Sequence, residues 1–147
     1  MSTFLFRELT LGSYYYQEAK ALRLEVLVNP FGIDPAEATR DDATAHHFAV
    51  FENRNCLAAL LLCPRTDRTL QMRQVAVQPS RQRQGLGKRL VTLSEEWATR
   101  QEYRLIWANI RESAEPFYRH LRYEIGAERF KLVGLEHRRA EKIIFAT

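Results

Sequence analysis

The sequence predicts a mixed α/β (α+β) fold, in which a central, mostly antiparallel sheet of about six to seven strands is flanked by about four helices. Runs rich in β-branched and aromatic residues alternate with segments of helical periodicity, in the order β-α-β-β-β-α-β-α-β-β. No repeat, low-complexity segment or long linker interrupts them, and 147 residues support one hydrophobic core. We therefore expect a single domain over residues 1–147.

The first expected elements are a strand and a helix. Phe4 to Leu9 is typical of a strand. Apolar residues then recur at helical spacing from Tyr15 to Val26, with Ser13 as the N-cap and an end before Pro30. The next segment, Asn29 to Ala45, carries two prolines, a glycine and several acidic residues, so we expect a loop with one short helical turn.

The middle of the chain predicts three strands and a long helix. His47 to Glu52, Leu57 to Cys63 and Thr69 to Val77 are rich in strand-forming residues and separated by short turns, which indicates an antiparallel meander. The helix is expected from Leu86 to about Arg100. Its apolar face is expected to contain Leu86, Leu90, Leu93 and Trp97.

The last part of the chain predicts a strand, a short helix and two further strands. The run "YRLIWANI", residues 103–110, is typical of a buried strand. A helix is expected over residues 113–121, with Ser113 as its N-cap and Pro116 in its first turn.

Composition narrows the class of protein. The chain is 46% hydrophobic and 27% charged, which is typical of a folded protein. No apolar run approaches the roughly 20 residues of a membrane-spanning helix, and the N-terminus lacks a secretory signal pattern. We therefore expect a cytoplasmic protein with no membrane partner. Cys56 and Cys63 lack the spacing of a zinc site or a redox pair, so we expect free, buried thiols and no metal.

The basic residues are mostly arginine, with four lysines among 22 basic residues and a net charge of +4. Arginine makes bidentate contacts with phosphate, whether in nucleic acid or in a small ligand. The basic residues concentrate in "QVAVQPSRQRQGLGKRL", residues 74–90, where a strand turns into the long helix. Free N–H groups and the helix dipole make such a turn an anion site. Gly85 and Gly87 would let an anion approach the backbone closely, because a Cβ there would hold it off. The side chains expected to add charge are Arg81, Arg83, Lys88 and Arg89.

Two common phosphate motifs do not fit this turn. The pattern GxxxxGK[ST] would need a glycine at Gln82 and a hydroxyl at Arg89. The dinucleotide pattern GxGxxG would need a glycine at Leu90, and the preceding meander is not a βαβ unit.

The pattern that fits is Gln82-x-x-Gly85-x-Gly87, between "VAV" and an amphipathic helix. It resembles the acyl-coenzyme A binding motif [RQ]-x-x-G-x-[GA] of the GNAT superfamily of N-acyltransferases. The segment "NIRESAEPFYRHLRYE" is similar to the family's second motif. The segments "ALRLEVLVNPFGID", "DDATAHHF" and "VGLEHRRAEKI" resemble a bacterial branch with LR-x-x-V-[FL], D-x-x-x-x-H and G-[IL]-x-H motifs. One departure is Arg122-Tyr123, where the family has Gly-Phe.

The resemblance implies a GNAT-like fold and transfer of an acetyl (acyl) group from acetyl-coenzyme A, as cosubstrate, to a primary amine by direct attack in a ternary complex. It assigns Tyr118 as the general acid for the departing thiolate, since tyrosine, with an ordinary pKa of about 10, is protonated at neutral pH. From the residues alone, Tyr118 is better explained as a core aromatic beside Phe117, and Asn109 could equally bind the pantetheine or cap the next turn. The residues implied to bind the coenzyme are Val75, Ala76, Val77, Gln82, Arg83, Gln84, Gly85, Leu86, Gly87, Lys88, Asn109 and Tyr118.

The general base stays open. Many family members use a glutamate on the fourth or fifth strand, but these strands offer Gln71, Arg73 and Gln74 instead. Solvent could serve, and histidine titrates in the useful range. Side chains elsewhere that could act are Glu25, Asp41, Asp42, His46, His47 and His137. The acceptor pocket is expected between the first helix, the Asn29 to Ala45 loop and the last strands.

Two other classes of function stay open. A protein of this fold could bind acyl-coenzyme A as a sensor or partner without turnover, for which the missing glutamate is an argument. A nucleic-acid-binding module would account for the arginine excess, but no such signature is present. The expected partners are therefore an amine on a small molecule or peptide, no nucleic acid, and a second copy in a homodimer, as in many family members.

Overall fold

The computed structural model describes residues 3–145. The strands are β1 (Phe4–Leu9), β2 (His46–Glu52), β3 (Asn55–Pro64), β4 (Thr69–Val77), β5 (Leu105–Arg111), β6 (Glu124–Ile125), β7 (Phe130–Leu132) and β8 (Leu135–Ile143). The helices are α1 (Tyr14–Arg23), α2 (Pro35–Ala38), α3 (Leu86–Arg100) and α4 (Glu115–His120). No helix within this range is long and apolar enough to cross a membrane.

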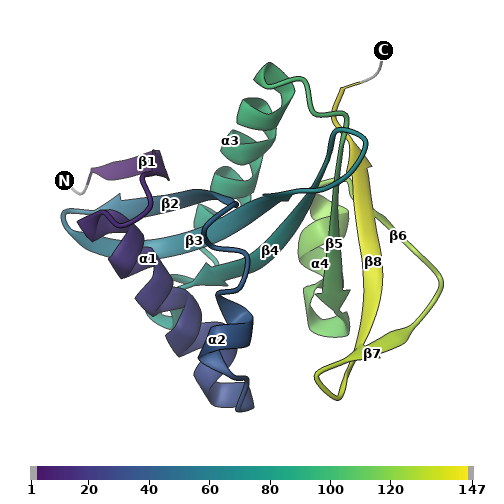
Figure 1. Cartoon of the computed structure of the whole chain (residues 1–147), viewed down its shortest axis with the longest axis horizontal. Coiled ribbons are helices and arrows are strands. Elements are labelled where there is room, and N and C mark those ends of the chain that lie inside the picture. Colours follow the sequence, from purple (N-terminus) through teal and green to yellow (C-terminus); the bar gives the residue numbers. More distant parts are fainter. Residues whose placement is uncertain (1–2, 146–147) are drawn as a thin grey trace.

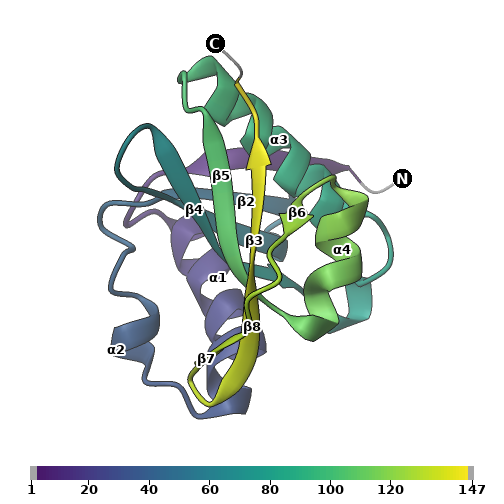
Figure 2. The same ribbon diagram turned by 90° about the vertical axis from the view of Figure 1, so that its right-hand side faces the viewer.

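The strands form one eight-stranded sheet with helices on both faces. The strand order is β1-β2-β3-β4-β5-β8-β6, and β7 pairs with β8 at the end of the sheet. β1 to β4 are antiparallel neighbours, whereas β4 and β5 are parallel. α1 and α2 lie on one side of the sheet and α3 and α4 on the other (Figures 1 and 2). The predicted mixed α/β fold, with its mostly antiparallel sheet, is confirmed.

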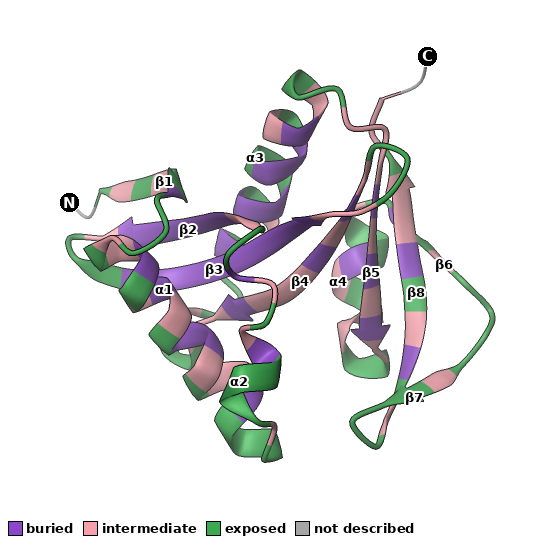
Figure 3. Cartoon of the chain, in the orientation of Figure 1, coloured by how far each residue is buried: buried purple, intermediate pink, exposed green. Residues whose placement is uncertain are grey.

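Two apolar clusters hold the helices on the sheet, one on each face. α1 contributes Tyr16, Ala19 and Leu22 to a cluster with Phe51 of β2. α3 contributes residues to the larger cluster on the opposite face, which continues onto α4. β3 is buried along nearly its whole length because both clusters cover it (Figure 3). The buried α3 residues are Leu86, Gly87, Leu90, Val91, Ser94, Glu95 and Ala98.

β4 and β5 separate after a short stretch of pairing, and this separation makes room for a site. The two strands pair only from Thr69–Leu105 to Gln71–Trp107, and they diverge toward their C-terminal ends (Figure 1). β4 also contains a β-bulge. From the pair Ala59–Ala76 to the pair Leu61–Arg73 there are two residue steps along β3 but three along β4, so β4 carries one extra residue. The bulge residue Gln74 has a φ of 53°, in the left-handed region that non-glycine residues rarely adopt.

Several predicted boundaries and roles were wrong in detail. The C-terminal region holds three strands, because β6 and β7 are short segments that pair with different parts of β8. Ser113 does not cap α4: residues 112–114 form a 3₁₀ turn, so that Ala114 is the N-cap. Leu93 is 38% exposed, because the buried face of α3 is rotated toward Val91 and Ala98. Ser13 does cap α1, and accepts a hydrogen bond from the N–H of Tyr16.

The Arg122-Tyr123 departure has a structural account. Arg122 has a φ of 69°, in the region that favours the glycine found here in the family it resembles. The hydroxyl of Tyr123 donates to Glu95 Oε2 at 2.8 Å, and Lys142 Nζ donates to the same carboxylate at 3.1 Å. The extra hydroxyl of the tyrosine is therefore satisfied inside the core, while the arginine occupies a strained backbone position.

Candidate active site

A cavity of about 860 Å³ lies between the diverging strands β4 and β5. On the α3 and α4 side, its wall includes the turn before α3 together with Phe117 and Tyr118. On the α1 and α2 side, it includes residues 26–28, Ile33 and Glu37. Residues of β7, β8 and their connection also contribute. Because the wall draws on both faces of the sheet, two ligands could meet between β4 and β5.

The N-terminus of α3 has free backbone donors at this cavity. Gly85 is the N-cap, with a φ of 78°, and has no side chain to accept from the first turn. The N–H groups of Leu86, Gly87 and Lys88 therefore have no protein acceptor within residues 3–145. Together with the helix dipole, these N–H groups are able to bind an anion.

The glycines of this turn serve the backbone and the packing. Gly85 adopts a left-handed conformation, and a Cβ there would meet open space. A Cβ on Gly87 would lie 3.2 Å from Val77 Cγ2 and 3.3 Å from Phe117 Cε1. Gly87 thus lets α3 pack closely on β4 and α4. That a Cβ at these positions would also hold off an anion stays a prediction.

The four basic residues of the turn have different surroundings. Arg81 forms an ion pair with Glu52, and the Arg89 guanidinium lies 4.4 Å from the centre of the Phe6 ring. Arg83 and Lys88 line the cavity and make no ion pair within residues 3–145. Lys88 lies in the first turn of α3, which has no acidic residue, so its charge opposes the helix dipole unless an anion binds there.

The edge of β4 that faces β5 is unpaired beyond Gln71 and offers backbone groups to a ligand. From Met72 to Val77 this edge has no strand partner among the described residues. Val75 and Val77 line the cavity, whereas Ala76 packs in the α1 cluster on the other face. Gln82 and Asn109 line the cavity and Gln84 does not.

Tyr118 lies in the cavity wall with its hydroxyl free of strong hydrogen bonds. It is 5% exposed, and its ring packs edge-on against Phe117 and Tyr123. The hydroxyl's one protein partner within residues 3–145 is Met72 Sδ, at 3.9 Å, which is a weak acceptor. Burial raises the pKa of Tyr118 above its ordinary value, so the hydroxyl is protonated at neutral pH. It can therefore donate a proton to a group in the cavity.

Of the six residues considered as a general base, only His137 lines the described cavity wall. Its Nδ1 is 2.8 Å from the carbonyl oxygen of Leu135, so Nδ1 carries the proton and Nε2 keeps a lone pair. His46 packs against Trp97 with a ring-centre distance of 4.5 Å, and its Nδ1 faces Glu8. Glu25 is exposed and lies outside the wall.

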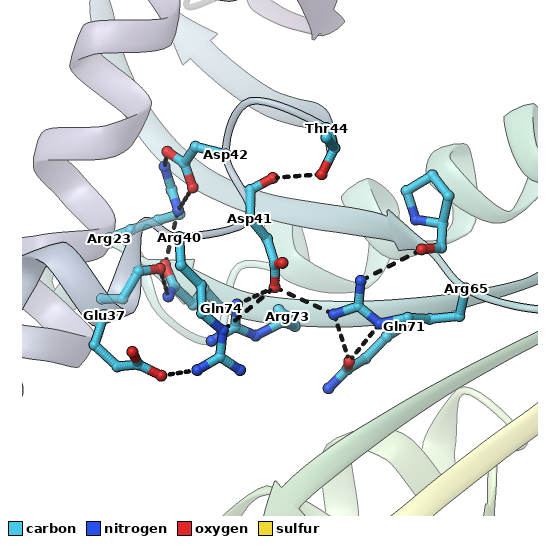
Figure 4. Close-up of polar contacts among 12 residues, drawn as sticks. Arg23, Glu37, Arg40, Asp41, Asp42, Thr44, Arg65, Gln71, Arg73 and Gln74 are labelled. Carbon is cyan, nitrogen blue, oxygen red and sulfur yellow. Dashed lines mark hydrogen bonds and ion pairs between the residues drawn. The ribbon is translucent and has the colours of Figure 1, made fainter.

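Asp42 and His47 belong to a buried polar network that joins α1 to the β4 bulge. Figure 4 shows the part of this network formed by Arg23, Asp42 and Gln74. Arg23 donates to both Asp42 oxygens, at 3.2 and 2.6 Å, and to Gln74 Oε1 at 2.8 Å. Tyr16 donates to Asp42 Oδ2 at 2.6 Å, and His47 Nε2 lies 2.8 Å from the Asp42 carbonyl oxygen. Burial lowers the pKa of His47. The LR-x-x-V and D-x-x-x-x-H patterns therefore mark a network that holds the bulge.

Asp41 is surrounded by arginines (Figure 4). Its Oδ2 accepts from Arg73 at 2.6 Å and from Arg65 at 3.2 Å. Burial raises the pKa of Asp41, but the hydrogen bonds and charges of the two arginines outweigh this effect, and the pKa is lower than usual. A carboxylate held in this way is a weak base.

The two cysteines are buried away from the cavity. Cys56 and Cys63 are free and buried, as predicted, and neither lines the cavity. Burial raises the pKa of Cys56 to about 12 and that of Cys63 to about 11, so both thiols are poor nucleophiles. Within residues 3–145, no group of three or more His, Cys, Asp or Glu side chains is arranged to hold a metal ion.

Sequence reasoning missed the arginines of the α1 and α2 side as site residues. Arg40, Arg73 and Arg111 all line the cavity. Arg111 was overlooked because β5 runs one residue farther than expected. Its position two residues after Asn109, and therefore on the same face of the strand, was the available signal.

Comparisons with known proteins agree with this architecture. The model of the acetyltransferase (GNAT) family matches residues 12–123. A Lactobacillus plantarum protein described as an N-acetyltransferase is 21% identical, with 97% of this chain and 99% of that chain covered and a TM-score of 0.87. The Escherichia coli ribosomal-protein-S18-alanine N-acetyltransferase is 16% identical, with coverage of 99% and 96% and a TM-score of 0.79. An aminoglycoside 6'-N-acetyltransferase in complex with coenzyme A is 14% identical, with coverage of 97% and 98% and a TM-score of 0.80.

At these identities the solved structures show the fold, whereas the family model spans most of the chain and shows the family. The chain belongs to the GNAT acetyltransferase family.

Proposed function

We propose that the protein is a coenzyme A dependent N-acyltransferase, which transfers an acetyl group from acetyl-coenzyme A to a primary amine by direct attack in a ternary complex. The observation that carries this proposal is the cavity between β4 and β5, whose wall includes the α3 anion site, Tyr118 and His137. The donor would occupy the α3 and α4 side and the amine the α1 and α2 side. Direct attack needs no acyl-enzyme, which fits the two inert thiols.

The donor's pyrophosphate would bind at the N-terminus of α3. The free N–H groups of Leu86, Gly87 and Lys88 face a cavity whose wall also contains the cations of Arg83 and Lys88. The pantetheine arm, which carries amide groups, would pair with the free edge of β4 from Met72 to Val77. The related fold of an aminoglycoside acetyltransferase that binds coenzyme A supports this placement.

Two side chains would move the protons of the reaction. The amine nitrogen attacks the thioester carbon, a C–N bond forms, and the C–S bond breaks when the tetrahedral intermediate collapses. Tyr118 would give its proton to the departing thiolate, since its hydroxyl is protonated and has only the sulfur of Met72 as a partner. His137 Nε2 would accept the proton that the amine loses, because Nδ1 is already committed to the Leu135 carbonyl.

Amine-dependent release of coenzyme A thiol tests the proposal. The protein is mixed with acetyl-coenzyme A and a panel of primary amines, and free thiol is followed over time. We expect thiol release to accelerate with at least one amine, in step with formation of the acetylated amine. Binding of acetyl-coenzyme A with no release for any amine would instead favour a sensor without turnover.

The role of His137 predicts a defect that depends on pH. We expect His137→Gln to lower kcat/KM about 10²-fold, the lower end of what general base catalysis contributes. The defect should shrink as the pH approaches the amine's own pKa, about 10 for a lysine-like amine, because more of the amine is then neutral without help. Rates of thiol release between pH 7 and 10 measure this.

His46→Gln is the matched control, since His46 lies away from the cavity against Trp97. We expect wild-type rates from it at every pH. A constant ratio of His137→Gln to wild-type rates across the pH range would contradict the role of base.

A further inference from the structure

The acceptor side of the cavity carries a cation, Arg111, that no carboxylate among residues 3–145 neutralises. Arg111, the last residue of β5, lines the cavity, and its guanidinium lies 4.0 Å from the centre of the Phe31 ring. No carboxylate lies within ion-pair distance of it in the part of the chain that the structure describes. Burial lowers the pKa of Arg111, and no neighbouring charge offsets that effect. A partly desolvated guanidinium without a counter-ion is a ready partner for an anion.

The surrounding charges do not compensate for Arg111. Glu37 is the one acidic side chain in the described part of the wall, and it forms an ion pair with Arg40. Asp41 is shared between Arg65 and Arg73. The region therefore places two carboxylates, Glu37 and Asp41, against four guanidinium groups, those of Arg40, Arg65, Arg73 and Arg111.

This balance of charge decides between classes of amine. A polycationic amine would need several carboxylates to hold its ammonium groups, and among the described residues the acceptor side of the wall offers one, the paired Glu37. An uncharged amine would leave Arg111 partly buried and unpaired, which is costly. An amine that also carries an anion would neutralise Arg111 and gain a charge-assisted hydrogen bond.

The wall near Arg111 is partly apolar. The stack of Arg111 on Phe31 joins the end of β5 to the 3₁₀ turn Asn29–Phe31, and Val28 and Ile33, which flank this turn, line the cavity. Val26 and Leu27 from the π-helical turn after α1 (Leu24–Val28) and Val133 from the β7–β8 connection supply apolar wall. The space suits a small molecule with an apolar part and an anionic end better than a folded protein surface.

We infer that the acceptor is a small primary amine bearing a carboxylate or phosphate group, and that Arg111 binds this group. The inference rests on the proposed function, because it assigns the α1 and α2 side of the cavity to the amine. Arg111 would position the substrate so that its nitrogen reaches His137, which pairs directly with Arg111 across β5 and β8. An interaction of this kind is made both before and during the reaction, so its loss should appear mainly in KM.

Matched pairs of amines test the inference. Each L-amino acid is compared with its amide, and O-phosphoethanolamine with ethanolamine, so that the members of a pair differ in the anion; spermidine represents polycations. We expect at least one anionic amine to exceed its uncharged counterpart at least 10-fold in kcat/KM, and spermidine to react poorly. The amide's amino group is less basic, so a larger fraction of it is neutral and able to attack. This difference favours the amide over the amino acid and therefore works against the expected result. A preference for an amino acid identifies the anionic group as a carboxylate, and a preference for O-phosphoethanolamine identifies it as a phosphate.

Variants connect the preference to Arg111. Arg111→Gln should raise KM for the preferred anionic amine about 10- to 100-fold, the usual loss for a charged hydrogen bond, and leave its uncharged counterpart unchanged. Arg129→Gln, at an exposed position outside the cavity, is the control and should keep the preference. The stabilisation of each variant by acetyl-coenzyme A is measured in parallel and should equal that of the wild type.

The outcomes separate the inference from the function on which it rests. The inference is overturned if acetyl-coenzyme A stabilises the protein but no anionic amine exceeds its counterpart, whether uncharged amines react equally well or no amine reacts. It is also overturned if Arg111→Gln keeps the anion preference. If acetyl-coenzyme A fails to stabilise the wild type, the proposed function fails first and the inference with it.

Discussion

Replacing Tyr118 with phenylalanine should lower kcat by about 10²- to 10⁴-fold, the usual contribution of general acid catalysis. The change removes one hydroxyl whose only protein partner within residues 3–145 is Met72 Sδ at 3.9 Å, so the fold loses no strong hydrogen bond. The ring keeps its contacts with Phe117 and Tyr123. The melting temperature and the affinity for acetyl-coenzyme A should therefore stay close to those of the wild type, while thiol release falls.

Tyr103→Phe provides the matched control for this variant. Tyr103 packs against Trp97 beyond the end of α3, outside the cavity, and its loss of a hydroxyl should leave kcat unchanged. If Tyr118→Phe turns over at the wild-type rate, the proton for the thiolate comes from another source, and the role assigned to Tyr118 is wrong.

Asp42→Asn should destabilise the protein by about 3–5 kcal/mol, the cost of breaking a buried ion pair by removing one partner. Arg23 is 1% exposed, and the substitution leaves its guanidinium buried without a carboxylate. The melting temperature should fall by about 6–20 °C, given the usual relation between free energy and melting temperature for a chain of this size. Thermal denaturation at neutral pH measures the difference.

The control for Asp42→Asn is an exposed ion pair in the same chain. Asp67 accepts from Arg104 at 2.6 Å, but its side chain is 77% exposed, so Asp67→Asn should cost less than about 1 kcal/mol. Equal effects of the two substitutions would contradict the structural role given to the Arg23–Asp42 pair.

Acid should remove the contribution of Asp42. Burial raises the pKa of Asp42, but hydrogen bonds from Arg23 and Tyr16 outweigh it, so the folded pKa lies below the ordinary value. A group of this kind stabilises the fold fully above its unfolded pKa of about 4 and loses its contribution as the pH falls through the folded pKa. The gap in melting temperature between wild type and Asp42→Asn should accordingly narrow below about pH 4.

Much of the fold followed from local patterns in the sequence. β4 has the predicted bounds, Thr69 to Val77, and α3 begins and ends as expected, because alternation and helical periodicity are local and strong there. The small strands β6 and β7 were not separable, since two or three residues are too few to show a period. The bulge at Gln74 depends on contacts with Arg23 and the Ala38 carbonyl, 51 and 36 residues away along the chain.

The candidate site was predictable in part for the same reason. The turn before α3 carries its own signal in Gly85 and the neighbouring cations, and the cavity does reach it. The environments of the histidines carry no such signal. His47 and His137 are both buried and both contact a backbone carbonyl, and only the fold shows that His137 lines the cavity and His47 does not. The ion pair of Arg81 with Glu52 likewise depends on a distant strand.

We propose that acetyl-coenzyme A binds with its pyrophosphate at the N-terminus of α3, and the melting temperature of the protein with and without acetyl-coenzyme A is the simplest test of this binding. At a ligand concentration about 100 times Kd, native-state binding stabilises by about 2.7 kcal/mol, and we expect the melting temperature to rise by about 5–10 °C. Lys88→Glu should keep or slightly raise the melting temperature of the free protein, since an acid in the first turn complements the helix dipole, and should lose most of the ligand-induced rise. An unchanged melting temperature of the wild-type protein in saturating acetyl-coenzyme A would contradict the claim.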